Sequence, residues 1–286
     1  MRQLIALLWA LVIAYAAVSA VMFAVNPARQ ILVLIVASVT MAVVHGAMRY
    51  GLTDALVFLA WFSVGGFAVE NLSVAAGPPF GLYHFTNAFD MPMIGRVPLD
   101  VGVMYFAMGY HAWVVGNILL DKADARLAHR FNRIALPVVA AFVMVMWGVV
   151  VDPGSATILR VWIWHNGGGY FGVPLINYLG WYVVVYVFFQ GFAWYLAARS
   201  DRAPIRSHDP GPSYWLPPVV LYLLVAAGAV ALYVVSPDTE HADAVGYVWR
   251  SKDIYETAVI VSLFTMGFAG VMAVLRLFQP RPDNIR

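Results

Sequence analysis

Residues Val151–Trp181 read VDPGSATILRVWIWHNGGGYFGVPLINYLGW. Long apolar runs lie on both sides of this stretch, whereas the stretch itself combines an aspartate, closely spaced tryptophans, a histidine, three consecutive glycines and an asparagine. A shorter stretch of similar composition lies upstream, between Glu70 and Asp100. We expect the two stretches to form one chemical site at one face of a helical membrane protein.

The composition of the 286 residues is that of a membrane protein. Hydrophobic residues make up 62% of the chain and charged residues 11%, with a mean hydropathy of +0.77; a soluble domain usually carries about 25% charged residues. Apolar runs of roughly 18 or more residues recur along the chain, and each is long enough to cross a bilayer. We therefore predict an all-α fold, a polytopic integral membrane bundle of about 8 (7–8) transmembrane helices, in a single membrane domain, 1–286.

The predicted spans end at Pro, Gly and polar residues, which stop apolar helices. The N-terminal apolar run is longer than the core of an ordinary signal peptide, so we interpret it as a retained first helix. The segment Thr157–His165 is too short to cross a membrane and is predicted to be a short interfacial or re-entrant helix. The predicted spans are Gln3–Val25, Ile31–Met48, Leu52–Ala75, Leu99–Leu120, Ile134–Val151, Val173–Ala198, Tyr214–Val235 and Ile254–Phe278.

The distribution of lysine and arginine predicts the orientation. Twelve of the 17 basic residues fall at the two chain ends or in the loops after the second, fourth and sixth helices, and five fall on the other face. Cytoplasmic loops carry the excess of Lys and Arg. Both termini are therefore predicted to be cytoplasmic, with the two unusual stretches open to the outer face of the cell membrane. The basic residues give no indication of nucleic-acid binding, and the lack of cysteine excludes disulfides and thiolate chemistry.

Carboxyl groups within membrane spans are costly, so they are candidates for function. Glu70 lies inside the third predicted helix and Asp152 closes the fifth at the same level. Asp90, Asp100 and Glu256 lie near that face too, but residues at helix ends in the headgroup region have an ordinary structural role, and carboxylates in a first turn complement the helix dipole. Glu70 and Asp152 are the candidate catalytic residues.

The aromatic and polar side chains of the two stretches are the candidates for substrate binding. The glycine run 167–169 has no phosphate-loop pattern around it, and irregular backbone at membrane depth is buried in protein or lines a cavity. The alternative for some of the aromatics is an interfacial belt. No histidine spacing predicts a metal site. The candidate substrate-binding residues are Tyr83, His84, Trp162, Trp164, His165, Tyr170, Asn177 and Trp181.

Acidic groups, aromatic rings and an apolar surrounding favour one class of reaction. A carboxyl group buried among apolar side chains keeps its proton and can protonate an alkene. Aromatic faces then stabilise the carbocation by about 0.5–2 kcal/mol each, and water admitted from the outer face can add to it. The residues make acid-initiated alkene chemistry plausible without identifying the substrate.

Several motifs resemble the carotenoid biosynthesis membrane family. Glu70 followed by GPPFGLYHFTNAF (77–89) and VP (97–98), then VDPG (151–154), WIW (162–164), GGGYFGVPLIN (167–177) and GW (180–181), carry the resemblance, which spans the second to sixth helices. After the VP pair, Asp100 departs from the apolar family pattern.

The resemblance implies a carotenoid 1,2-hydratase without a cofactor, which adds water across the terminal C1=C2 bond of an acyclic carotenoid end. It implies Glu70 and Asp152 as the acid and the water-positioning group, in an order left open. The implied partners are a lycopene-like or C50 acyclic carotenoid, membrane lipid and other carotenoid biosynthesis enzymes.

Two other readings stay open. A lycopene-cyclase-like enzyme would start with the same protonation and then close a ring, which leaves the mass of the pigment unchanged. A transporter or binding protein is the non-enzymatic alternative, since broken helices around a polar site are typical of transporters. A retinal protein is disfavoured because the two lysines, Lys122 and Lys252, do not lie well inside a span.

Overall fold

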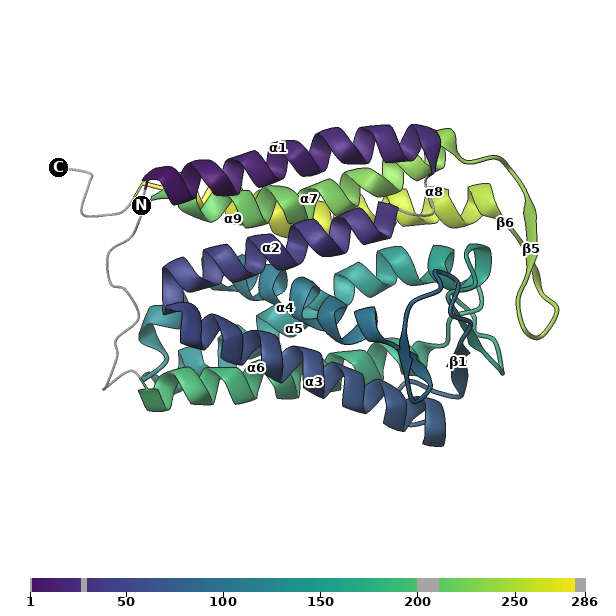
Figure 1. Ribbon diagram of the computed structural model, residues 1–286, viewed down its shortest axis with the longest axis horizontal. Coiled ribbons are helices and arrows are strands. Elements are labelled where there is room, and N and C mark those ends of the chain that lie inside the picture. The colour runs from purple at the N-terminus through teal and green to yellow at the C-terminus, as the bar shows by residue number, and fades with distance from the viewer. Residues whose placement is uncertain (1, 27–29, 200–210, 281–286) are drawn as a thin grey trace.

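The computed structural model describes residues 2–26, 30–199 and 211–280, and within them long antiparallel helices form one bundle (Figure 1). Two of the helices continue through π-helical turns: α5 runs on through Gly154–Ile158, and Leu263–Gly267 joins α8 to α9. The helices are α1 (Arg2–Val25), α2 (Gln30–Tyr50), α3 (Leu52–Ala76), α4 (Leu99–Leu119), α5 (Arg130–Pro153), α6 (Leu175–Arg199), α7 (Pro212–Val235), α8 (Ser251–Ser262) and α9 (Phe268–Phe278).

Seven helices of the described chain are long and apolar enough to cross a membrane. The prediction of a polytopic helical membrane protein is therefore confirmed, and the chain is an integral membrane protein. The eighth long helix, α4, is less apolar but is the central one: 14 of its 21 residues are buried, and it packs against α2, α3, α5, α7 and α9. Because protein rather than lipid surrounds α4, it can carry polar side chains such as Tyr105, His111 and Asn117.

Short strands lie at one end of the bundle, opposite the start of α1 (Figure 1). We call this the strand end, and we call the end that carries the 3-10 helix η2 (Ala123–Arg126) the opposite end. β2 (Met93–Ile94) pairs with β3 (Val97–Pro98), and β5 (Glu240–Ala242) pairs with β6 (Val248–Arg250).

The third pair joins the two stretches that the sequence singles out. β1 (Tyr83–Phe85) and β4 (Trp162–Trp164) are antiparallel, with Tyr83 opposite Trp164 and Phe85 opposite Trp162. The prediction of a short helix over Thr157–His165 is wrong: its first residues finish the π-helical turn and its last residues form β4. Trp-Ile-Trp alternates across a strand, and β1 supplies the hydrogen bonds that a helix would have supplied internally.

One close approach between helices depends on a glycine. A Cβ at Gly66 of α3 would lie 2.5 Å from the Tyr105 ring of α4. The missing side chain lets this ring pack directly on the α3 backbone, one turn from Glu70.

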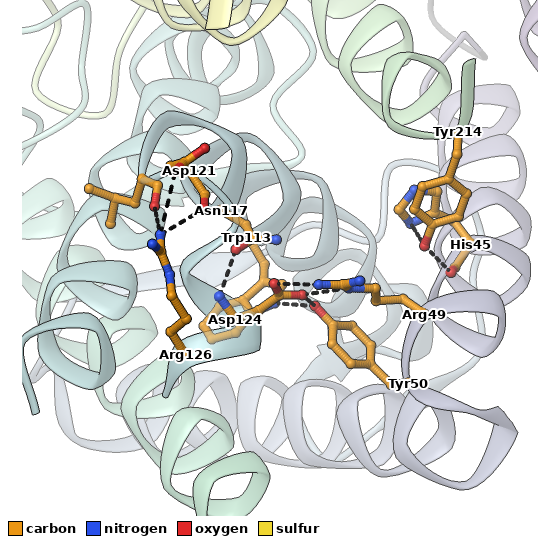
Figure 2. Close-up of polar contacts among 10 residues, drawn as sticks. His45, Arg49, Tyr50, Trp113, Asn117, Asp121, Asp124, Arg126 and Tyr214 are labelled. Atoms are coloured by element: carbon orange, nitrogen blue, oxygen red, sulfur yellow. Dashed lines mark hydrogen bonds and ion pairs between the residues drawn. The ribbon is translucent and has the colours of Figure 1, made fainter. Parts of the chain in front are cut away.

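A buried ion pair fixes the opposite end (Figure 2). Arg49 at the end of α2 donates from Nε and Nη2 to the two oxygens of Asp124 in η2, at 2.9 and 2.8 Å. The Tyr50 hydroxyl also donates to Asp124, at 2.8 Å, and itself accepts from Trp113 Nε1 at 2.9 Å. This bidentate pair ties α2 to the loop after α4.

Candidate active site

A cavity lies at the strand end, between the β1–β4 sheet and the adjoining parts of α2 to α6. The space inside its wall, counted together with the open solvent at its mouth, is about 880 Å³. Most of its wall is apolar, from Leu34 and Ile35 of α2 to Met104 and Met108 of α4. Besides the tryptophan indoles, the side chains in the lining that can take part in acid–base or hydrogen-bond chemistry are Ser38, Glu70, Tyr83, Tyr105, Asp152 and Asn177.

The Glu70 carboxyl group is buried and accepts hydrogen bonds on both oxygens. Tyr105 donates to Oε1 at 2.7 Å, and Tyr83 donates to Oε2. Trp181 Nε1 donates in turn to the Tyr105 hydroxyl at 2.6 Å. An indole N–H can only donate, so the Tyr105 hydroxyl must direct its own proton toward Glu70. The chain from Trp181 through Tyr105 fixes Glu70 as an acceptor.

Asp152 faces the same cavity from the last turn of α5. Its Oδ2 accepts from Asn177 Nδ2 at 2.9 Å, and Asn177 is the one residue of the described chain whose side chain bonds this carboxyl group. The two carboxyl groups, on α3 and α5, line the same cavity. The fold thus brings together two acids that are separated in the sequence by the whole of α4 and almost all of α5.

The β1–β4 sheet supplies the aromatic wall. Tyr83 and Trp164 have ring centroids 5.7 Å apart, and Phe85 lies edge-on to Trp162 at 6.1 Å. Trp164 Nε1 donates to the Phe80 carbonyl at 3.0 Å, which holds the sheet to the loop after α3. These four rings all line the cavity.

Strand alternation places His84 and His165 elsewhere. Both are exposed, and His84 Nδ1 lies 3.0 Å from His165 Nε2 on the side of the sheet away from the cavity lining. Tyr170 is also outside the lining, with its hydroxyl donating to the Val149 carbonyl at 3.0 Å. Among the predicted site residues, the cavity therefore gathers Glu70, Tyr83, Asp152, Trp162, Trp164, Asn177 and Trp181.

The sequence reading missed Tyr105, although a signal for it exists. Glu70 lies six residues before the end of α3 and Tyr105 six residues after the start of α4. In antiparallel neighbours this spacing puts both at the same depth, about 9 Å from the helix ends. A hydroxyl at the depth of a buried acid is a candidate partner for it.

Two tyrosines outside the helices, Tyr83 and Tyr170, have raised pKa values. Burial, and next the Glu70 carboxyl group, raise the pKa of Tyr83 well above its ordinary value. Burial and then Asp152 raise the pKa of Tyr170 to about 12. The Tyr83 hydroxyl therefore stays protonated and remains a donor at any physiological pH.

The arrangement suits proton transfer within an apolar pocket. Two acids face one space, aromatic rings line it, and no group of three or more His, Asp or Glu side chains in the described residues is placed to hold a metal ion. Fold and cavity together define an integral membrane protein with a buried acid pair in an aromatic-walled pocket.

The comparisons place that protein in a family. Residues 30–249 match the model of the family described as carotenoid biosynthesis protein, which covers well over half of the chain, so the chain belongs to this family. It is 31% identical over 185 residues to the bisanhydrobacterioruberin hydratase of Haloarcula japonica. The alignment covers 63% of this chain and 56% of that relative, little more than half of its length. No solved structure matches the chain.

Proposed function

We propose that this protein is a carotenoid hydratase, which adds water across the terminal C1=C2 double bond of an acyclic carotenoid. The observation that carries the proposal is the pair of buried acids, Glu70 and Asp152, in one aromatic-walled cavity. Membership of the carotenoid biosynthesis family and similarity to a hydratase support the substrate class and the reaction.

Hydrogen bonding divides the roles between the two acids. A carboxyl group that accepts a hydroxyl proton on each oxygen behaves as the ionised, acceptor-only form, and Glu70 is bonded in this way. Asp152 accepts one amide donor from the described residues and keeps an oxygen that can carry a proton into the cavity. In this proposal Asp152 is the acid and Glu70 the base.

The steps balance without a cofactor. The π electrons of the double bond take the Asp152 proton to form a new C2–H bond, which leaves the positive charge on the more substituted C1. The rings of Tyr83, Trp162 and Trp164 stabilise this cation by about 0.5–2 kcal/mol each. A water molecule then bonds to C1 and loses a proton to Glu70, giving a tertiary alcohol. Transfer of that proton back to Asp152 restores the site.

We further propose a single membrane domain, 1–286, in the cell membrane with both termini cytoplasmic. The helices alternate direction, so among the described residues Arg49, Arg126, Arg199 and Arg276 all lie at the end opposite the strands. The positive-inside tendency then directs the strand end, and the cavity, to the outer side. Membrane lipid would deliver the apolar substrate to the cavity, and other carotenoid biosynthesis enzymes would be its partners.

Expression in cells that accumulate lycopene tests the activity by the mass of the extracted pigments. We expect products heavier by one water, and we expect Glu70→Gln and Asp152→Asn each to abolish them without loss of membrane expression. Glu256→Gln is the matched control, because Glu256 lies at the same end of the bundle but is exposed and outside the cavity lining. Normal turnover in either cavity variant would remove that residue from the mechanism. A new pigment of unchanged mass would indicate cyclisation instead.

A further inference from the structure

Four buried polar atoms lie along one side of the cavity and continue beyond it. Ser38 Oγ, His45 Nε2, His111 Nε2 and Trp147 Nε1 have no hydrogen-bond partner among the described residues, and the four residues are at most 2% exposed. Buried polar groups in proteins are almost always hydrogen-bonded to protein or to ordered water. Four such groups together therefore need a common explanation.

The helix positions connect these atoms to the cavity. Met104, Ala107 and Met108 line the cavity, and His111 follows on the same face of α4, one turn deeper. Ser38 lines the cavity from α2, and His45 lies two turns deeper on that helix. Trp147 lines it from α5. The polar atoms thus run from the cavity wall toward the opposite end of the bundle.

The rings of this group are contiguous. His45 lies 5.7 Å from Tyr110, Tyr110 lies 6.3 Å from His111, and His111 lies 6.3 Å from Trp147, between ring centroids. Beyond His45, Tyr214 and then Arg49 continue the polar side chains to the ion pair of the opposite end (Figure 2).

The unpaired atoms of these groups include both hydrogen-bond donors and acceptors. His111 Nδ1 donates to the Ala107 carbonyl at 2.7 Å, so its Nε2 is an acceptor. His45 Nδ1 lies 2.6 Å from the Tyr110 hydroxyl. In the tautomer in which that hydroxyl donates to Nδ1, Nε2 carries the proton and is a donor. Trp147 Nε1 is a donor and the Ser38 hydroxyl can act as either. Buried acceptors and donors without a protein partner are the groups that ordered water molecules bond.

We infer that ordered water binds these four groups, and that water from this site is what is added to the substrate. The second part rests on the proposed hydratase function. An apolar carotenoid end that fills the cavity displaces water from its apolar wall, whereas water held behind the cavity by His111 and Trp147 would remain. In hydration the substrate gains one water, and the acid pair neither gains nor loses a proton overall. The site must therefore retain a water molecule while the substrate is bound.

The water site can be tested without the reaction. Hydroxyl radicals generated in place by X-ray pulses label side chains that contact bound water. We expect Trp147 and His111 to be labelled quickly in the purified protein, although they are buried. Trp113 is the matched control, since it is equally buried but its Nε1 is bonded to Tyr50. Labelling of Trp147 and His111 no faster than that of Trp113 would overturn the inference.

The role of the water is tested by kinetics of the purified protein with lycopene. We expect His111→Leu to lower kcat about tenfold with KM unchanged, and His111→Gln, which keeps a polar group there, to recover most of it. The pair Ser38→Ala and Ser38→Thr gives the same comparison if the leucine variant does not fold. Equal kcat within both pairs would contradict the role even if labelling succeeds. A wild-type protein that yields no hydrated product would refute the proposed function instead, and labelling would still decide the water site.

Discussion

Tyr105 is the residue that makes the acid pair unequal. Its hydroxyl accepts a hydrogen bond from Trp181 and donates one to Glu70, so Trp181 fixes the direction in which the hydroxyl donates. Asp152 has an amide partner instead, Asn177. Two acids in one cavity acquire different roles because their immediate donors differ.

The variant Tyr105→Phe removes the hydroxyl and keeps the ring. Loss of one aligned donor to a charged group in an active site typically costs about a hundredfold in kcat, and we expect a loss of that order with KM almost unchanged. Steady-state hydration by the purified variant measures it. Tyr222→Phe is the control, because it removes a buried tyrosine hydroxyl that bonds Val143 outside the cavity. Equal rates in the two variants would show that Tyr105 has no special role.

At the scale of elements, the long helices could be predicted and the short pieces could not. Runs of 18 or more apolar residues identify spans by length alone, and an acid inside such a run is conspicuous, as with Glu70. By contrast, the pairing of Tyr83–Phe85 with Trp162–Trp164 joins distant segments through backbone hydrogen bonds that no local pattern encodes. Short apolar runs fit helix or strand equally, so the sequence of Thr157–His165 does not distinguish the two. Tyr105 resembled a packing residue because its function depends on neighbours from α3 and α6.

The contact between α3 and α4 depends on the packing of the Tyr105 ring against Gly66. Gly66→Ala places a Cβ 2.5 Å from the Tyr105 ring, so the ring or the helices must shift. We expect a loss of about 1–3 kcal/mol in the free energy of unfolding, together with a fall in activity. Thermal unfolding in detergent and product formation measure the two effects. In Gly228→Ala the new Cβ would be 3.4 Å from Phe23, so this control should unfold no earlier than the wild type; similar losses in both variants would exclude the ring contact as the cause.

The orientation of the molecule in the membrane can be measured directly. The chain has no cysteine, so single cysteines report position without further engineering. We expect Ala244→Cys, in the exposed loop between β5 and β6, to react with a membrane-impermeant thiol reagent added to intact cells. Ala125→Cys in η2, exposed at the opposite end, should react only after the cells are opened. The reverse pattern would invert the proposed topology.

The central claim is that the two acids add water to a carotenoid double bond. Purified protein incubated with lycopene in deuterated, oxygen-18-labelled water tests it by mass spectrometry. The account predicts a product with one oxygen-18 in a tertiary hydroxyl and one deuterium on the adjacent carbon, absent from the Asp152→Asn variant. If pigment incubated with folded protein gains no oxygen-18 from the water, with or without a gain of deuterium, the claim is contradicted.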